Sequence, residues 1–119
     1  MKWAPPEPVD AILLDAPCSA TGIFRRHPDV LHRVRPKAIA ALAEAQKGML
    51  LRAADWLKPG GALVYSVCSL EPEEGEAVAE AFLASRDDYR IAERQRILPG
   101  AYADEGGADA FFIARFVRK

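Results

Sequence analysis

Two cysteines stand at matching places in this sequence, each directly after a short apolar run. Cys18 lies in the segment Asp15-Ala16-Pro17-Cys18-Ser19, and Cys68 lies in Val67-Cys68-Ser69. If both runs are neighbouring parallel strands, their carboxyl ends bring two thiols and the Asp15 carboxylate into one cleft, where open parallel sheets bind ligands. A thiolate there could add to an electron-poor carbon. A single cysteine at a strand end is most often a small buried residue, but the matched positions favour a shared chemical role.

The elements that would position these thiols alternate between strand and helix. Residues 9–14 and 62–67 are apolar runs typical of strands buried on both faces. After Pro36, apolar residues recur at three- and four-residue steps and predict a helix over residues 36–57, which Lys58-Pro59-Gly60-Gly61 ends. Three glutamates near position 72 favour the start of a second helix, over residues 71–85, through the helix dipole. This alternation predicts an α/β fold with a parallel sheet.

The end of the chain is less regular. Residues 89–97 are compatible with a strand, residues 98–109 form a loop rich in glycine, alanine and acidic residues, and residues 110–117 form an aromatic strand. Two late strands joined by a loop most simply add an antiparallel edge to the parallel sheet. In the last strand, we expect Phe111 and Phe112 to pack in the core rather than to stack on bases.

A basic segment lies between the first strand and the first helix. Residues 20–35 show no sustained period and predict a long loop. In and just after this loop, the basic residues gather around a single acid, Asp29; they are Arg25, Arg26, His27, His32, Arg33, Arg35 and Lys37. Such a segment can neutralise phosphates, and a solvated loop is the alternative. Beside the cysteines, we expect Ser19 and Ser69 to bond to backbone groups in their own turns.

Composition excludes several classes of protein. The 119 residues, 50% of them hydrophobic and 28% charged, suffice for one compact core. No apolar run approaches the ~18 to 20 residues of a membrane span, and the N-terminus lacks the apolar stretch of a signal peptide, so we expect a soluble, cytoplasmic protein without membrane contact. The net charge of −1 gives no global reason to expect nucleic acid. Two cysteines without zinc-ligand spacing predict neither a metal site nor a structural disulfide.

These motifs resemble those of the RNA 5-methylcytosine methyltransferases, and within that family the bacterial Fmu/Sun branch of ribosomal RNA small-subunit methyltransferases B. The resemblance rests on the Asp-Ala-Pro-Cys-Ser segment followed by Gly22, on Leu57-Lys58-Pro59-Gly60-Gly61, and on Tyr65-Ser66-Val67-Cys68-Ser69. Arg25-Arg26-His27-Pro28-Asp29 and residues 109–115 add to it, so that it covers nearly the whole chain. The paired cysteine motifs are specific, whereas the Pro-Gly-Gly turn alone occurs in many methyltransferases.

The resemblance implies a Rossmann-like methyltransferase that uses S-adenosylmethionine on RNA, with ribosomal RNA as the expected substrate. It makes Cys68 the nucleophile that adds to carbon 6 of cytosine, after which carbon 5 takes the methyl group. Cys18 then assists the release of the carbon 5 proton. Asp15 matches an acidic position that contacts cofactor or cytosine. The set Arg25, Arg26 and His27 would hold RNA phosphate or an unstacked target nucleotide.

By the same resemblance, part of the enzyme is expected to be missing. A complete one begins with a strand and a glycine-rich turn for the methionyl part of the cofactor, followed by an acid for the ribose hydroxyls. The eight glycines include no G-x-G arrangement after a strand. We therefore expect residues 1–119 to be the C-terminal part of a catalytic domain, without its N-terminal cofactor-binding half and RNA-binding domain, and inactive alone. The strand at residues 11–14 would then present an open apolar sheet edge, which favours a homodimer or aggregation.

Other classes of function stay open on the residues alone. A non-catalytic RNA-binding or assembly module could keep the fold and the basic segment without turnover. A thiol redox protein is disfavoured because the chain has no Cys-x-x-Cys motif. Methylation of an exocyclic nitrogen is disfavoured too, since such sites typically have Pro-Pro-aromatic after the acid, whereas this chain has Ala-Pro-Cys.

Overall fold

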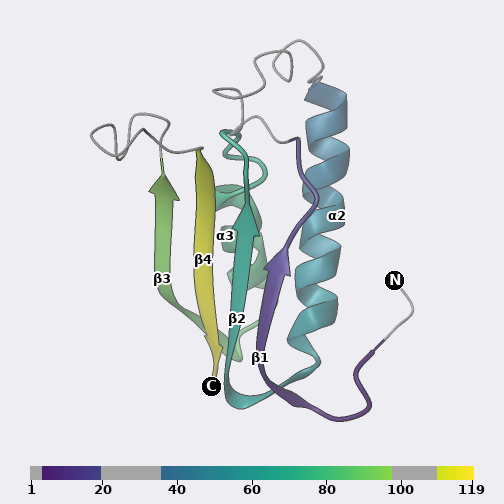
Figure 1. Ribbon diagram of the computed structural model, residues 1–119, viewed down its shortest axis with the longest axis vertical. Helices are drawn as coiled ribbons and strands as arrows, with labels where there is room; N and C mark the ends of the chain where they lie inside the picture. The colour runs from purple at the N-terminus through teal and green to yellow at the C-terminus, as the bar shows by residue number, and fades with distance from the viewer. Residues whose placement is uncertain (1–3, 20–35, 98–109) are drawn as a thin grey trace.

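The fold is a four-stranded mixed sheet with two helices packed on it. A computed structural model describes residues 4–19, 36–97 and 110–119. Its elements follow one another as β1 (Val9–Asp15), α2 (Pro36–Ala54), β2 (Leu57–Val67), α3 (Glu76–Ser85), β3 (Tyr89–Ile97) and β4 (Phe111–Arg118). The sheet order is β1-β2-β4-β3, as Figure 1 shows. β1 and β2 pair in parallel, and β4 pairs antiparallel with both β2 and β3. The parallel sheet with an antiparallel edge expected from the sequence is confirmed.

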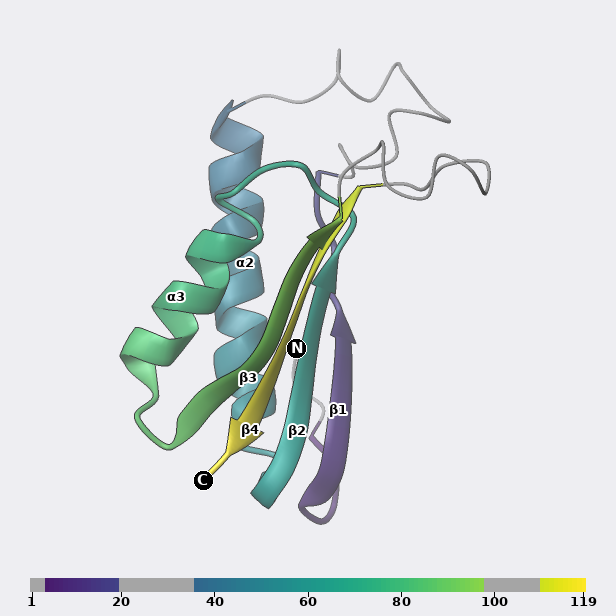
Figure 2. The same ribbon diagram turned by 90° about the vertical axis from the view of Figure 1, so that its left-hand side faces the viewer.

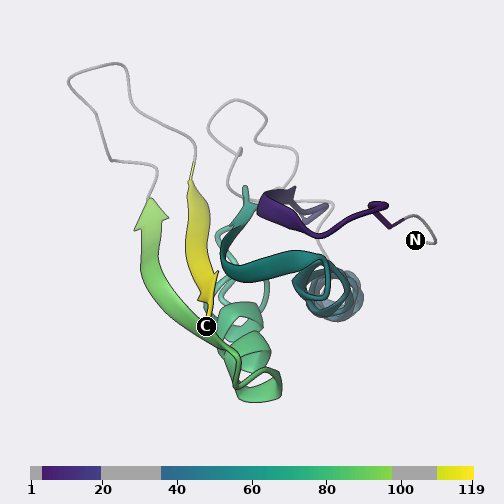
Figure 3. The same ribbon diagram turned by 90° about the horizontal axis from the view of Figure 1, so that it is seen from below.

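Both helices lie on the same face of the sheet, as Figures 2 and 3 show. The core forms between that face and the helices, because β2 and β4 alternate buried and partly exposed residues along their length. The Phe82 ring of α3 lies at the centre of this core, 4.8 Å from the ring of Phe116 and 5.1 Å from the ring of Tyr89. Phe112 is also buried, whereas Phe111 points to the other face and is partly exposed. The expected core role thus holds for Phe112 and only in part for Phe111.

The join between α2 and β2 differs from the expected one. The helix ends at Ala54 rather than at residue 57, and β2 begins at Leu57. The Pro-Gly-Gly turn lies inside the strand as an irregularity, since Val9 pairs with Leu57 while Ala11 already pairs with Ala62. Gly60 has a φ of 84°, and a β-carbon on Gly61 would stand 2.8 Å from the backbone oxygen of Asp10. The positive φ favours glycine at position 60. At position 61 glycine is required because β1 and β2 approach one another so closely.

β1 is an edge strand, and the prediction that both of its faces are buried was wrong. One face packs on the core through Ile12 and Leu14, which are partly buried. Leu13, on the other face, is 71% exposed. The apolar run predicted a strand correctly, but an apolar run does not show whether both faces of that strand are covered.

The second helix begins later than expected. It starts at Glu76 after Gly75, and residues 71–75 form turns before it. Of the glutamates expected at the helix N-terminus, Glu74 is instead fully buried. No described helix is long and apolar enough to cross a membrane.

Candidate active site

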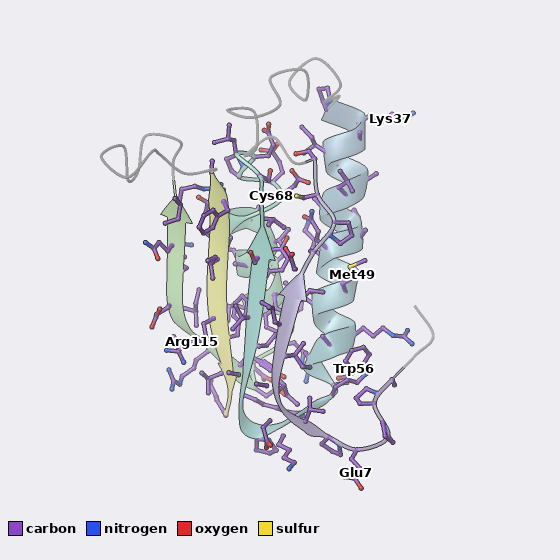
Figure 4. The ribbon with its side chains drawn as sticks, in the orientation of Figure 1. Glu7, Lys37, Met49, Trp56, Cys68 and Arg115 are labelled. Atoms are coloured by element: carbon purple, nitrogen blue, oxygen red, sulfur yellow. The ribbon has the colours of Figure 1, made fainter. Side chains whose placement is uncertain are left out.

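The two cysteines lie side by side where the parallel strands end. Cys18 follows β1 and Cys68 follows β2, and their Sγ atoms are 3.5 Å apart. Figure 4 shows Cys68 at the end of β2, beside the chain that leaves β1. Both side chains are partly exposed. The juxtaposition expected from parallel pairing is therefore confirmed, and the thiols are accessible.

A buried carboxylate joins the two cysteine loops. Glu74 is fully buried, and its Oε2 accepts hydrogen bonds from Ser19 Oγ at 2.6 Å and Ser69 Oγ at 2.5 Å. Its Oε1 accepts from the backbone N–H of Ser19 at 2.8 Å. A carboxylate that is buried away from water needs hydrogen-bond donors in place of its hydration, and the residues that follow each cysteine supply them.

Two further side chains complete this network. Gln46 is fully buried on α2, and its Nε2 donates to Glu74 Oε1 at 3.1 Å and to the carbonyl oxygen of Pro17 at 2.9 Å. The hydroxyl of Tyr65 on β2 donates to the backbone oxygen of Glu74 at 2.6 Å. Burial raises the pKa of the Tyr65 phenol far above its ordinary range, and the charges of Glu74 and Cys18 raise it further. Tyr65 therefore keeps its proton and acts as a donor.

An arginine holds the Cys68 loop from the other side. Arg96 on β3 donates to the carbonyl oxygen of Ser69 and to both carboxylate oxygens of Glu76. Its guanidinium carbon lies 5.4 Å from the centre of the Phe112 ring. The Arg96 hydrogen bond lowers the pKa of Glu76. β3 and α3 are thereby tied to the loop that carries Cys68.

Of the other predicted site residues, the structure describes Asp15 but not the three basic ones. Asp15 ends β1 with an exposed side chain, and with the described residues that side chain forms no hydrogen bond or ion pair. Arg25, Arg26 and His27 lie outside the described residues. Within the described ranges, no group of three or more His, Cys, Asp or Glu side chains is arranged to hold a metal ion.

Sequence reasoning missed the residues that support the thiols. Ser19 and Ser69 were expected to bond locally, and Ser69 Oγ does accept from the backbone N–H of Glu71 at 3.0 Å. Both hydroxyls nevertheless donate to Glu74, which lies 55 and 5 residues away along the chain. One signal was present, because Gln46 is a polar residue on the apolar stripe of α2. Glu74 gave none, since it follows Pro72 as an ordinary helix-start acid would.

The arrangement suits nucleophilic chemistry. Both cysteines are partly exposed, their sulfurs lie 3.5 Å apart at the ends of β1 and β2, and a thiol can serve as a nucleophile toward a bound substrate. The exposed carboxylate of Asp15, at the end of the neighbouring strand, can accept hydrogen bonds or pair with a cation. Ligands bind at this end of parallel strands in open α/β sheets.

The chain is similar to known methyltransferases along nearly its whole length. Residues 1–117 match the model of the family described as 16S rRNA methyltransferase RsmB/F. The chain is 45% identical to ribosomal RNA small subunit methyltransferase B of Salmonella arizonae, over 99% of this chain and 28% of that protein. It is 43% identical to the protein of the same name from Thermus thermophilus, over 95% of this chain and 30% of that protein.

A solved structure extends the likeness to the fold. NSun6 from Pyrococcus horikoshii, solved with SFG, matches with a TM-score of 0.79 and 30% identity, over 94% of this chain and 30% of that chain. The Rossmann-like methyltransferase fold expected from the sequence is confirmed by this likeness. The chain spans less than a third of the length of each of these relatives.

Proposed function

The chain belongs to the 16S rRNA methyltransferase RsmB/F family, and on that premise we propose that it carries the reaction centre for methylation of carbon 5 of cytosine in ribosomal RNA. The observation that carries the proposal is the 3.5 Å separation of the Cys18 and Cys68 sulfurs at the carboxyl ends of parallel strands. Carbons 5 and 6 of cytosine are adjacent ring atoms, so one thiol for each carbon requires this kind of close pair.

In the proposed mechanism, Cys68 is the nucleophile. Its thiolate adds to carbon 6, which breaks the double bond to carbon 5 and makes carbon 5 electron-rich. S-adenosylmethionine, when bound, would supply an electrophilic methyl group for carbon 5, with S-adenosylhomocysteine as the leaving group. The Cys18 thiolate then takes the proton from carbon 5, the double bond between carbons 5 and 6 forms again, and Cys68 leaves as a thiolate. Each cysteine therefore acts on one of the two neighbouring carbons.

The described residues fit a cationic methyl donor. S-adenosylmethionine carries a sulfonium and an ammonium group, and the exposed Asp15 carboxylate ends the strand next to Cys68. We assign Asp15 to the methionyl ammonium or to the base edge of the cytosine. Arg25, Arg26 and His27 are assigned to RNA phosphates or to the unstacked nucleotide, because a base inside a helix cannot reach the thiols.

The test is covalent trapping with RNA that contains 5-fluorocytosine. Fluorine on carbon 5 cannot leave as a proton, so the adduct between Cys68 and carbon 6 accumulates. The protein is a chimaera in which this chain replaces the matching segment of the Thermus thermophilus relative, and the adduct is read on a denaturing gel. We expect Cys68→Ala to abolish the adduct and Cys18→Ala to retain it.

Two results would contradict this assignment. An adduct that still forms in Cys68→Ala would show that another residue is the nucleophile. A chimaera that methylates RNA normally but gives no adduct would exclude the thiol-addition mechanism. A chimaera that binds RNA with neither turnover nor adduct, beside an active Thermus thermophilus control, would favour a non-catalytic RNA-binding module.

We further propose that the chain alone is inactive, as part of a larger catalytic domain. The support is the open β1 edge, which a longer parallel sheet would cover, together with the greater length of its relatives. Calorimetry of this chain with S-adenosylmethionine should show weak or undetectable binding. Micromolar affinity would mean that the chain holds a complete cofactor site.

The open edge also supports self-association of the isolated chain. Among the described strands, β1 pairs only with β2, and its outer face exposes Leu13. An exposed apolar edge strand is a template for pairing with another copy. We therefore propose that the chain forms a homodimer or larger assemblies through β1.

A further inference from the structure

Glu74 occupies a place that its contribution to folding does not explain. It is a fully buried acid, and within the described structure no lysine or arginine forms an ion pair with it. Burying a carboxylate costs free energy, and an apolar side chain of similar size would avoid that cost. The donors that surround Glu74 come from the two segments that carry the thiols. Its position therefore points to a role in the site.

We propose that Glu74 is a positioning residue that holds the Cys18 and Cys68 loops together and so sets the distance between the two thiols. The proposal rests on the proposed function in one respect only, namely that a close thiol pair serves methyl transfer. Glu74 touches neither sulfur in this proposal. It acts through Ser19 and Ser69, the residues that directly follow the cysteines.

Among the described residues, the backbone hydrogen bonds between the two strand ends stop just before the cysteines. The bond nearest to them runs from the N–H of Ala16 to the carbonyl oxygen of Ser66, at 3.0 Å. Cys18 and Cys68 each lie two residues beyond that bond. Past this point side chains make the connection, because the Ser19 and Ser69 hydroxyls lie 3.4 Å apart and both donate to Glu74 Oε2.

Three side chains hold Glu74 and the segments that it joins. Tyr65 fixes its backbone by donating to the carbonyl oxygen at 2.6 Å. Gln46 bridges Oε1 to the carbonyl oxygen of Pro17, which is the residue before Cys18. Arg96 holds the carbonyl oxygen of Ser69 from the side of β3. Because its surroundings are fixed in this way, Glu74 can hold both thiol loops in defined positions.

The experiment measures how strongly the chain holds its thiols together, without RNA or cofactor. The chain is equilibrated in glutathione redox buffers, where two cysteine thiols and one oxidised glutathione give one protein disulfide and two reduced glutathiones. The thiol protons end on the reduced glutathione. The equilibrium constant is the effective molarity of one thiol toward the other, which is a direct readout of their positioning. Thiol counts by mass spectrometry give the populations.

Two variants and one matched control decide the outcome. Ser19→Ala removes one hydroxyl hydrogen bond to Glu74 together with the 3.4 Å hydroxyl contact between Ser19 and Ser69. Glu74→Ala removes every hydrogen bond of the carboxylate to the two loops. Tyr89→Phe is the control, because it removes one buried hydroxyl hydrogen bond, to the Ala54 oxygen at 2.7 Å, at the opposite end of the sheet. We expect Glu74→Ala to lower the effective molarity about tenfold or more, Ser19→Ala to lower it severalfold, and Tyr89→Phe to leave it within about twofold.

The proposal is overturned if folded Glu74→Ala and Ser19→Ala keep the effective molarity of the unsubstituted chain while urea melts show lost stability. Glu74 would then be structural only. If circular dichroism shows that Glu74→Ala does not fold, the effective molarity of the milder Ser19→Ala variant decides whether the proposal holds. An unsubstituted chain that forms no Cys18–Cys68 disulfide would also overturn it. Failure of the trapping experiment leaves this readout intact, so the two proposals fail separately.

Discussion

Gly75 lies against the ring of Phe112 so closely that a β-carbon on Gly75 would stand 2.9 Å from Cγ of that ring. The same β-carbon would stand 2.7 Å from Nη2 of Arg96, which holds the Cys68 loop. Phe112 is buried and cannot move aside without disturbing the core. The turn before α3 is therefore packed directly against the arginine that supports the candidate active site.

Gly75→Ala should lower the free energy of unfolding by about 1–3 kcal/mol, because the added methyl group overpacks the contact with Phe112. Urea unfolding followed by circular dichroism measures the loss. Gly48→Ala is the control, since Gly48 lies in α2 and a β-carbon there meets nothing within 4 Å. It should raise stability by about 0.5–1 kcal/mol through helix propensity. Equal effects of the two substitutions would contradict the close packing at Gly75.

Arg96→Lys should destabilise the protein although it keeps the charge. Lysine lacks the planar fork with which Arg96 binds the Ser69 carbonyl oxygen and Glu76 together. We expect a loss of about 1–3 kcal/mol in urea unfolding, since partly buried acceptors lose their charged donor. Arg94→Lys, in which the exposed arginine lies 3.7 Å from Glu80, should change stability by less than about 0.5 kcal/mol. Similar losses in both variants would show that Arg96 acts only as a surface charge.

Stability should fall as the pH drops from about 4 to about 2. Arg86 donates two hydrogen bonds to Asp88 and lowers the pKa of that carboxyl from 3.8 to about 2. Between these values the unfolded chain binds more protons than the folded chain, so protonation favours unfolding. Above about pH 4 the contribution of Asp88 is complete.

Asp88→Asn tests this pH dependence. The variant should be less stable at neutral pH and should lose less stability between pH 4 and pH 2. Part of the slope should remain, because Arg96 also lowers the pKa of Glu76. Thermal melts across this range measure both effects, with Asp87→Asn, an exposed neighbour, as the control. An unchanged slope in Asp88→Asn would exclude Asp88 as the group responsible.

Leu13→Lys should reduce self-association of the chain. Leu13 is 71% exposed on the edge strand, and a lysine there blunts strand pairing by charge repulsion between copies. Light scattering at high concentration should show a smaller mean mass for the variant than for the unsubstituted chain. A monodisperse monomer of the unsubstituted chain at high concentration would contradict association through β1.

The order of elements and the pairing of the thiols could be predicted from the sequence because both depend on local patterns. Apolar runs and helical periodicity are properties of short segments, and parallel strands must end at the same edge of a sheet. These two facts suffice to bring Cys18 and Cys68 together. The family motifs then supplied the chemistry that the thiol pair suits.

What only the tertiary structure decided is how that pair is held. Glu74, Gln46 and Arg96 come from three separate segments of the chain, and no local pattern shows that they converge on the two cysteine loops. The sequence did not predict the exposure of Leu13 either, since an apolar run predicts a strand but not whether both of its faces are covered. Local preference fixes each segment, whereas burial and long-range hydrogen bonds depend on which segments pack against one another.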